Sequence, residues 1–178
     1  MADMEITTDL EKKPSVIVGM NLKAAEPGFE YVSTKTYTHS VGLSCAFRQW
    51  RAQSHCRFVH GYALKVHFEF TGVELDARNW LVDFGGLKPL KAMLEANLDH
   101  KVLVAEDDPN LDFFKEAAAL DIMDVVIVPS TGCETTARMI FESTVQWLKD
   151  AGYGDRITLS SVQVAEHDGN SAMYRRTK

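Results

Sequence analysis

The chain has 178 residues, 46% of them hydrophobic and 25% charged, with a formal net charge of −6. This length and composition fit one globular domain with a sizeable core. The acidic balance argues against nucleic acid as a partner, and no segment is long and apolar enough to suggest a membrane span.

The first 28 residues are polar apart from the short apolar run VIVGM. They contain no basic stretch followed by an apolar one, so they do not resemble a signal peptide. We interpret residues 1–28 as an N-terminal arm that is ordered against a partner subunit or poorly ordered, and residues 29–178 as one domain. The three cysteines, an odd number, fit free thiols and predict a cytoplasmic location.

The next segments have the composition of strands. Residues 29–47, FEYVSTKTYTHSVGLSCAF, are rich in aromatic and β-branched residues and predict one long strand or two short ones. In residues 62–72 apolar and polar residues alternate, which predicts a strand with one buried face. The residues of that face are Tyr62, Leu64, Val66, Phe68 and Phe70.

Two helices are predicted from apolar residues at helical spacing. The first lies within residues 83–98 and buries Leu87, Leu90, Leu94 and Leu98. The second lies within residues 133–152 and buries Ala137, Ile140, Phe141, Thr144 and Leu148.

The remaining segments are shorter. Residues 101–120 read as a loop with one short helix at most, and DVVIVP as a buried extended segment. ITLSSVQVAEHD and SAMYRR predict closing strands. The order of strands, helix, helix and strands predicts an α+β fold in which helices cover one face of an antiparallel sheet.

The stretch CRFVHGY, residues 56–62, contains the first candidate site residues. Residues two apart on a strand point the same way, so His60 shares the inward face with Tyr62. A polar pair at the mouth of an apolar face indicates a pocket. The alternative is a core histidine with satisfied hydrogen bonds beside a strand-end tyrosine.

Asp99 and His100 are adjacent after the first predicted helix. A carboxylate beside an imidazole can hold its tautomer and raise its basicity, which suits proton transfer. The alternative is that His100 interacts with the helix dipole while Asp99 is solvated.

Glu166 follows Val162 and Val164 on one face of the last long predicted strand. A carboxylate at the end of an apolar face needs a partner, and a guanidine-like edge, as in a pterin or guanine, would pair with both oxygens. The alternative is that the strand has already ended and Glu166 is exposed.

Thr131 and Glu134 form a T-x-x-E pattern before the second predicted helix, which predicts a capping box. The same helix N-terminus could receive the polar edge of a ligand. Cys133 lies in the first turn, where we expect a somewhat acidified thiol.

Taken in order from about residue 30 to the end, five stretches resemble the 6-pyruvoyltetrahydropterin synthase / 6-carboxytetrahydropterin synthase family. They are CRFVHGY, FEFTGVELDARNWLVDFGGLK, LDHKVL, GCETTA and VQVAEHD. The resemblance implies the tunnelling fold, an α+β fold with a four-stranded antiparallel sheet and two helices on one face. It also implies trimers or hexamers with the site between subunits, and 7,8-dihydroneopterin triphosphate as substrate.

The resemblance also implies roles for single residues. Cys56 matches the thiol that moves protons on the substrate side chain, and Asp99 and His100 match the dyad that assists it. Glu166 matches the anchor of the pterin's amino-pyrimidine edge. Cys133, Glu134 and Tyr62 are expected to line the pocket.

The chain departs from the family at the metal site. The family binds zinc with three histidines, and here Phe47 and Tyr62 stand at two of those positions while His60 keeps the third. We therefore expect zinc to be weakly bound or absent. A rebuilt site of Cys45, His60 and Tyr62 is the alternative.

The leading functional hypothesis is a cytoplasmic lyase of the 6-carboxytetrahydropterin synthase type, with Cys56 in proton transfer and products that feed deazaguanine (queuosine) or pterin synthesis. The second is a catalytically silent oligomer that binds a pterin or purine after loss of the zinc site. A purely structural oligomer is the third.

Overall fold

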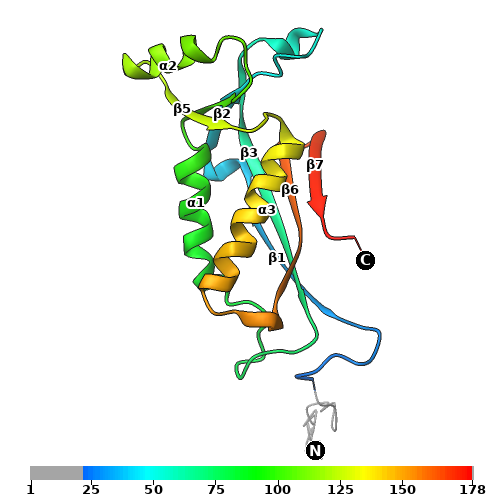
Figure 1. Ribbon diagram of the computed structural model, residues 1–178. Helices are drawn as coiled ribbons and strands as arrows, with labels where there is room; N and C mark the ends of the chain where they lie inside the picture. The colour runs from blue at the N-terminus through cyan, green and yellow to red at the C-terminus, as the bar shows by residue number, and fades with distance from the viewer. Residues whose placement is uncertain (1–21, 178) are drawn as a thin grey trace, which may run out of the picture.

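The strands of the computed structural model, which describes residues 22–177, join into one seven-stranded sheet (Figure 1). The prediction of an N-terminal arm falls mainly on residues 1–21, which lie outside the described residues. The strands are β1 (Tyr31–Tyr37), β2 (Leu43–Phe47), β3 (His60–Gly72), β4 (Lys101–Ala105), β5 (Asp124–Val128), β6 (Thr158–His167) and β7 (Asn170–Arg175). The helices are α1 (Lys88–Leu98), α2 (Leu111–Ala119) and α3 (Cys133–Asp150).

Strand β3 is the centre of this sheet. Strand β6 pairs antiparallel with one edge of β3, and β1 and β2 pair in succession along the other. A short 3-10 turn, His39–Val41, separates β1 from β2, and Gly42 ends it with a φ of 81°. The predicted alternation along β3 is confirmed, because Leu64, Val66, Phe68 and Phe70 are all buried.

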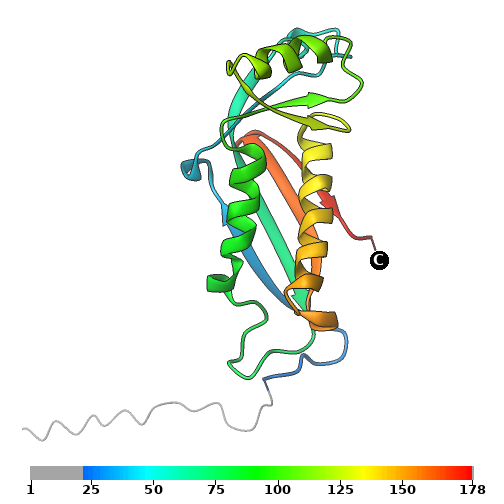
Figure 2. The same ribbon diagram turned by 60° about the vertical axis from the view of Figure 1, so that its left-hand side comes forward.

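Helices α1 and α3 lie side by side across one face of the β1–β3–β6 part of the sheet (Figures 1 and 2). Both predicted apolar stripes are confirmed, since the residues named for each helix are buried. They pack with the inward side chains of β3 in one core. Among residues 22–177, no helix combines the length and apolarity that crossing a bilayer requires.

The prediction of four strands and two helices is wrong. Residues 101–120, read as a loop with one short helix at most, form strand β4 and helix α2, and the predicted extended segment DVVIVP contains β5. Strand β4 pairs parallel with β2, and β5 pairs parallel with β4. Parallel strands are often covered on both faces and then show continuous apolar runs without the period of two. The run KVLVA is of this kind, and its last three residues are buried, so the alternation that marked β3 is absent.

A buried ion pair ties β2 to β4 just beyond their ends. Arg48 follows β2, and its Nε donates to the Asp108 carboxylate at 2.7 Å, with a second bond from Nη2. The Asp108 side chain is 1% exposed and the Arg48 side chain 19%. The hydrogen bond from Arg48 is the main reason that the pKa of Asp108 is lowered.

We predict that Asp108→Asn lowers the free energy of unfolding by about 3 kcal/mol at pH 7, because it leaves a largely buried guanidinium without its counter-charge. Asp107→Asn is the matched control, since the neighbouring Asp107 pairs with Arg51 near the surface and should change stability by less than about 1 kcal/mol. Urea unfolding measures both.

The same pair predicts a pH dependence. A carboxylate with a depressed pKa in the folded state stabilises the fold above its unfolded pKa, and that stabilisation is lost as pH falls through the folded value. Asp108→Asn should therefore reduce the acid dependence of stability below about pH 4. Equal stability of the Asp108→Asn and Asp107→Asn variants would contradict this account of the β2–β4 junction.

Candidate functional site

The first residues of β3 place three aromatic rings together at one end of the core. In the antiparallel register Phe47 lies opposite His60, and Cys45 lies opposite Tyr62. The ring centroids of Phe47 and His60 are 5.5 Å apart, and those of His60 and Tyr62 5.6 Å apart. The prediction that His60 and Tyr62 share the inward face is confirmed.

The imidazole of His60 has a defined hydrogen bond. Its Nδ1 lies 2.7 Å from the backbone carbonyl oxygen of Phe58, so this nitrogen must carry the proton and donate. Nε2 is then left with its lone pair in the neutral ring, which makes it the one nitrogen of His60 that is open to a ligand.

Glu166 reaches this cluster because the pairing of β6 is interrupted beside it. The register between β6 and β7 shifts between Ala165 and His167, so Glu166 is the extra residue of a bulge. Bulges re-aim side chains. Here Glu166 lies close to the thiol of Cys133, at the start of α3, and its carboxylate contributes to raising the pKa of that thiol.

The Cys133 thiol stays protonated, and the expectation of an acidified cysteine is wrong. The pKa of Cys133 is raised to about 12, first by burial and then by the negative charges of Glu166 and Glu134. These two carboxylates and burial outweigh the helix N-terminus that would favour a thiolate. At neutral pH Cys133 is therefore a neutral and unreactive thiol close to Glu166.

Tyr62 lies within electrostatic reach of Glu166 and Cys133. Its pKa is raised, first by burial and then by Glu166, Cys56 and Cys133. The hydroxyl remains a phenol, able to donate a hydrogen bond. The structure thus gathers Tyr62, Glu166, Cys56 and Cys133, which were predicted from three separate segments, in one region.

The loop that carries Cys56 is fastened to the start of α3 through Gln49. The N–H of Gln49 donates to the Cys56 carbonyl at 2.9 Å, and its Nε2 donates to the Thr131 carbonyl at 3.2 Å. Thr131 in turn donates from Oγ1 to the Arg48 carbonyl at 2.7 Å. Sequence reasoning missed Gln49, because a glutamine that bridges two loops leaves no local pattern.

The prediction of a capping box at Thr131 and Glu134 is wrong, because Thr131 bonds to a distant segment of the chain. Thr131 uses its hydroxyl on Arg48, and the helix begins instead after Gly132, with a φ of 109° and no side-chain cap. A side chain at residue 132 would also collide with Gln49 Nε2, so glycine leaves the room that this connection needs. Glu134 is exposed in the first turn of α3.

Asp99 and His100 form the predicted pair, but not beside Cys56. His100 Nδ1 is 2.8 Å from Asp99 Oδ1, and the N–H of Ser44 donates to the same oxygen at 3.3 Å. Ser44 lies three strand positions, about 10 Å, from Phe47 and its partner His60. Cys56 lies further on, opposite Gln49, so one chain does not bring the thiol and the dyad together.

The arginines near the site are mostly neutralised. Arg48 pairs with Asp108 and Arg51 with Asp107, so the positive charges of these two arginines are largely cancelled. The guanidinium of Arg57 lies 4.9 Å from the ring centroid of Phe58. Of the three arginines, Arg57 is the one for which no carboxylate partner appears among the described ion pairs.

The residues at the implied metal site do not fit zinc. Phe47 offers no donor atom and is 2% exposed, and the raised pKa of Tyr62 disfavours the phenolate that a metal would require. Burial likewise raises the pKa of Cys45 to about 12, against the rebuilt alternative. Within residues 22–177 no three His, Cys, Asp or Glu side chains are grouped to hold a metal ion.

Comparison with known proteins decides the family. The family model described as 6-pyruvoyl tetrahydropterin synthase matches residues 36–177. The chain belongs to this family. A curated relative, a probable 6-carboxy-5,6,7,8-tetrahydropterin synthase of Halobacterium salinarum, is 29% identical over 91 residues. That match covers 51% of this chain and 57% of the relative's length.

Solved structures share the fold at low identity. An uncharacterized protein of Wolinella succinogenes has a TM-score of 0.69 and 20% identity, over 84% of this chain and 99% of its own. The 6-pyruvoyl tetrahydropterin synthase of Plasmodium falciparum has a TM-score of 0.60 and 14% identity, over 83% and 98%. These similarities establish the tunnelling fold of the 6-pyruvoyl tetrahydropterin synthases.

We predict that the purified protein carries well under one zinc per chain by elemental analysis, and that chelators leave its melting temperature unchanged. The pair Phe47→His with Tyr62→His should restore zinc uptake, because residue 47 faces His60 across the β2–β3 ladder and residue 62 lies beside it. Phe68→His, which also adds a histidine to the inward face of β3, is the control and should bind none. Near-stoichiometric zinc in the unmodified protein would refute this prediction.

Proposed function

We propose that the chain binds a pterin at the Glu166 end of β6 and acts on it as a lyase of the 6-carboxytetrahydropterin synthase type. The substrate would be 7,8-dihydroneopterin triphosphate or a related pterin, processed in the cytoplasm toward a deazaguanine or another pterin. The observation that carries the proposal is the Glu166 carboxylate, which lies at a bulge close to Cys133 and Tyr62, while Cys56 is within electrostatic reach of the same Tyr62.

Glu166 has the chemistry that a pterin requires. The amino-pyrimidine edge presents two parallel N–H donors, and a carboxylate can accept both in a charge-assisted pair. Cys133 and Tyr62 would complete the pocket wall, one thiol and one phenol that both remain protonated. Family membership and the curated relative of the same enzyme type support this assignment.

Cys56 would serve as the proton-transfer residue. As a thiolate it would accept a proton from a carbon of the substrate side chain, and His100, oriented by Asp99, would assist the return of a proton. Because the dyad and Cys56 are apart in one chain, the proposal requires a neighbouring copy to supply Asp99 and His100. The largely exposed imidazole, 84% accessible, is available for such a contact.

A trimer or hexamer is therefore part of the proposal. Strand β1 and strand β7 are the open edges of the antiparallel part of the sheet within the described chain, and unpaired edges are usually covered.

A catalytically silent pterin- or purine-binding oligomer is the second candidate. It is favoured by the donor set around His60, which lacks the zinc ligands that would polarise a substrate oxygen. In this case Glu166 would still bind the ligand, but no turnover would follow.

For recognition, we predict that Glu166→Gln weakens binding of 7,8-dihydroneopterin by at least about tenfold, because the amide loses the charge and one acceptor. Glu142→Gln is the control, since Glu142 is an exposed carboxylate on α3 paired with Arg138. Calorimetry measures both affinities, and unchanged affinity in Glu166→Gln would remove this residue from the site.

For catalysis, we predict that Cys56→Ala and His100→Ala each reduce turnover of 7,8-dihydroneopterin triphosphate by about 100-fold or more, with pterin binding retained. Oligomers that contain both variants should recover up to roughly a quarter of the parent rate if each site takes its thiol and dyad from different copies. Co-expression with two affinity tags isolates the mixed species.

The controls separate the two candidate functions. Binding without any turnover in the unmodified protein would select the silent oligomer. Full activity in Cys56→Ala would reduce Cys56 to a packing residue, and no recovery in mixed oligomers would contradict the sharing of the site between copies.

A further inference from the structure

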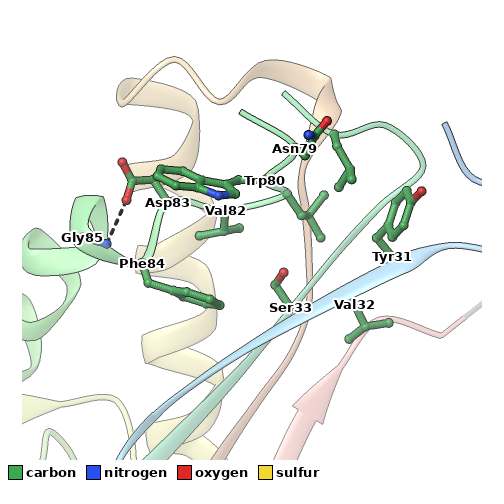
Figure 3. A pocket seen from close by; sticks show the side chains of 11 residues that line it. Tyr31, Val32, Ser33, Asn79, Trp80, Val82, Asp83, Phe84 and Gly85 are labelled. Atoms are coloured by element: carbon green, nitrogen blue, oxygen red, sulfur yellow. Dashed lines mark hydrogen bonds between the residues drawn. The ribbon is translucent and has the colours of Figure 1, made fainter. Parts of the chain in front are cut away.

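A pocket of about 490 Å³ lies between strand β1 and the loop that precedes α1, away from the Glu166 site. Figure 3 shows the side chains of Trp80 and Phe84 on one side, and those of Val32 and Ser33 on β1 across from them. Leu75, Leu81 and Val82 also line it. The lining is predominantly apolar, as in pockets that receive a hydrophobic group.

The walls of this pocket are exposed yet held in place. Val32, Trp80 and Phe84 are 55%, 45% and 52% exposed among the described residues. The Arg78 guanidinium stacks on Trp80, 4.2 Å from its ring centroid, and is itself bound by Asp76 and Asp83. Trp80 held by Arg78, the neighbouring Phe84 and the edge strand β1 form an apolar groove that the rest of the described chain leaves open.

The chain enters the described structure at the rim of the same pocket. The Tyr31 hydroxyl donates to the Leu22 carbonyl, and the N–H of Leu75 donates to the Lys23 carbonyl at 2.8 Å. Ala24 forms a bridge with Glu74. Tyr31 and Leu75 both line the pocket, so the first described residues are fixed directly beside it.

We propose that the apolar run VIVGM, residues 16–20 of this chain, docks in the pocket between β1 and Trp80. The run ends two residues before Leu22, so a chain of at most about 3.5 Å per residue reaches the pocket from its rim. VIVGM is the apolar run of an otherwise polar N-terminal segment, so its side chains suit the apolar lining of the pocket. Docking would bury Val32, Trp80 and Phe84 together with Ile17 and its neighbours.

Hydrogen exchange on the full-length protein tests this proposal. Amides of residues 79–85 should exchange at least about tenfold more slowly in the unmodified chain than in Ile17→Asp. Leu10→Asp is the matched control in the N-terminal segment and should behave as the unmodified chain. Exchange of the β3 amides, unchanged in all variants, verifies that the core is intact.

A second pair of variants tests the wall of the pocket. Val32→Lys should accelerate exchange at residues 79–85 as Ile17→Asp does, whereas Val59→Lys, at a similarly exposed valine, should not. A synthetic PSVIVGMN peptide added to Ile17→Asp should restore the protection. Equal exchange in Ile17→Asp and the unmodified chain would overturn the proposal. So would protection that depends on protein concentration but not on Ile17, which would identify a second copy as the occupant.

Discussion

The pairing of β3 on both edges is the constraint on which the rest of the structure depends. Its 13 residues are long enough to pair with β1 and β2 on one side and β6 on the other. The inward residues of its second half form the floor under α1 and α3. Its first residues, His60 and Tyr62, project from the same face beyond the helices, so the site is an extension of the core strand.

The chemistry of the site follows from the groups that surround its one half-buried carboxylate. One carboxylate, Glu166, faces a thiol and a phenol whose pKa values are both raised, so it is met by neutral donors. Such an arrangement suits a ligand that brings paired N–H groups, and it is poorly suited to a metal that requires deprotonated ligands. With Phe47 and Tyr62 beside it, His60 lacks the further nitrogen donors that zinc would need, whereas Glu166 offers the carboxylate to which our proposal assigns the pterin edge.

The sequence was a good guide wherever burial is periodic. The alternation of β3 and the stripes of α1 and α3 predicted those elements, because each needs only local spacing. It failed for β4, whose continuous apolar run has no period, although DVVIVP was correctly predicted as an extended segment. It also failed for the capping role of Thr131 and for the acidity of Cys133. The Thr131 hydroxyl donates to the Arg48 carbonyl, and burial and Glu166 raise the pKa of Cys133, and both effects depend on contacts with distant segments. The separation of Asp99 from Cys56 is set by strand register, which spacing along the chain does not reveal.

A crystal structure of the protein soaked with 7,8-dihydroneopterin, with anomalous data at the zinc edge, tests the central claim most directly. The account predicts the amino-pyrimidine edge of the pterin on the Glu166 carboxylate, Cys133 and Tyr62 against the ring, and no anomalous peak at His60 Nε2. A pterin bound elsewhere in the fold, with Glu166 unpaired, would contradict it.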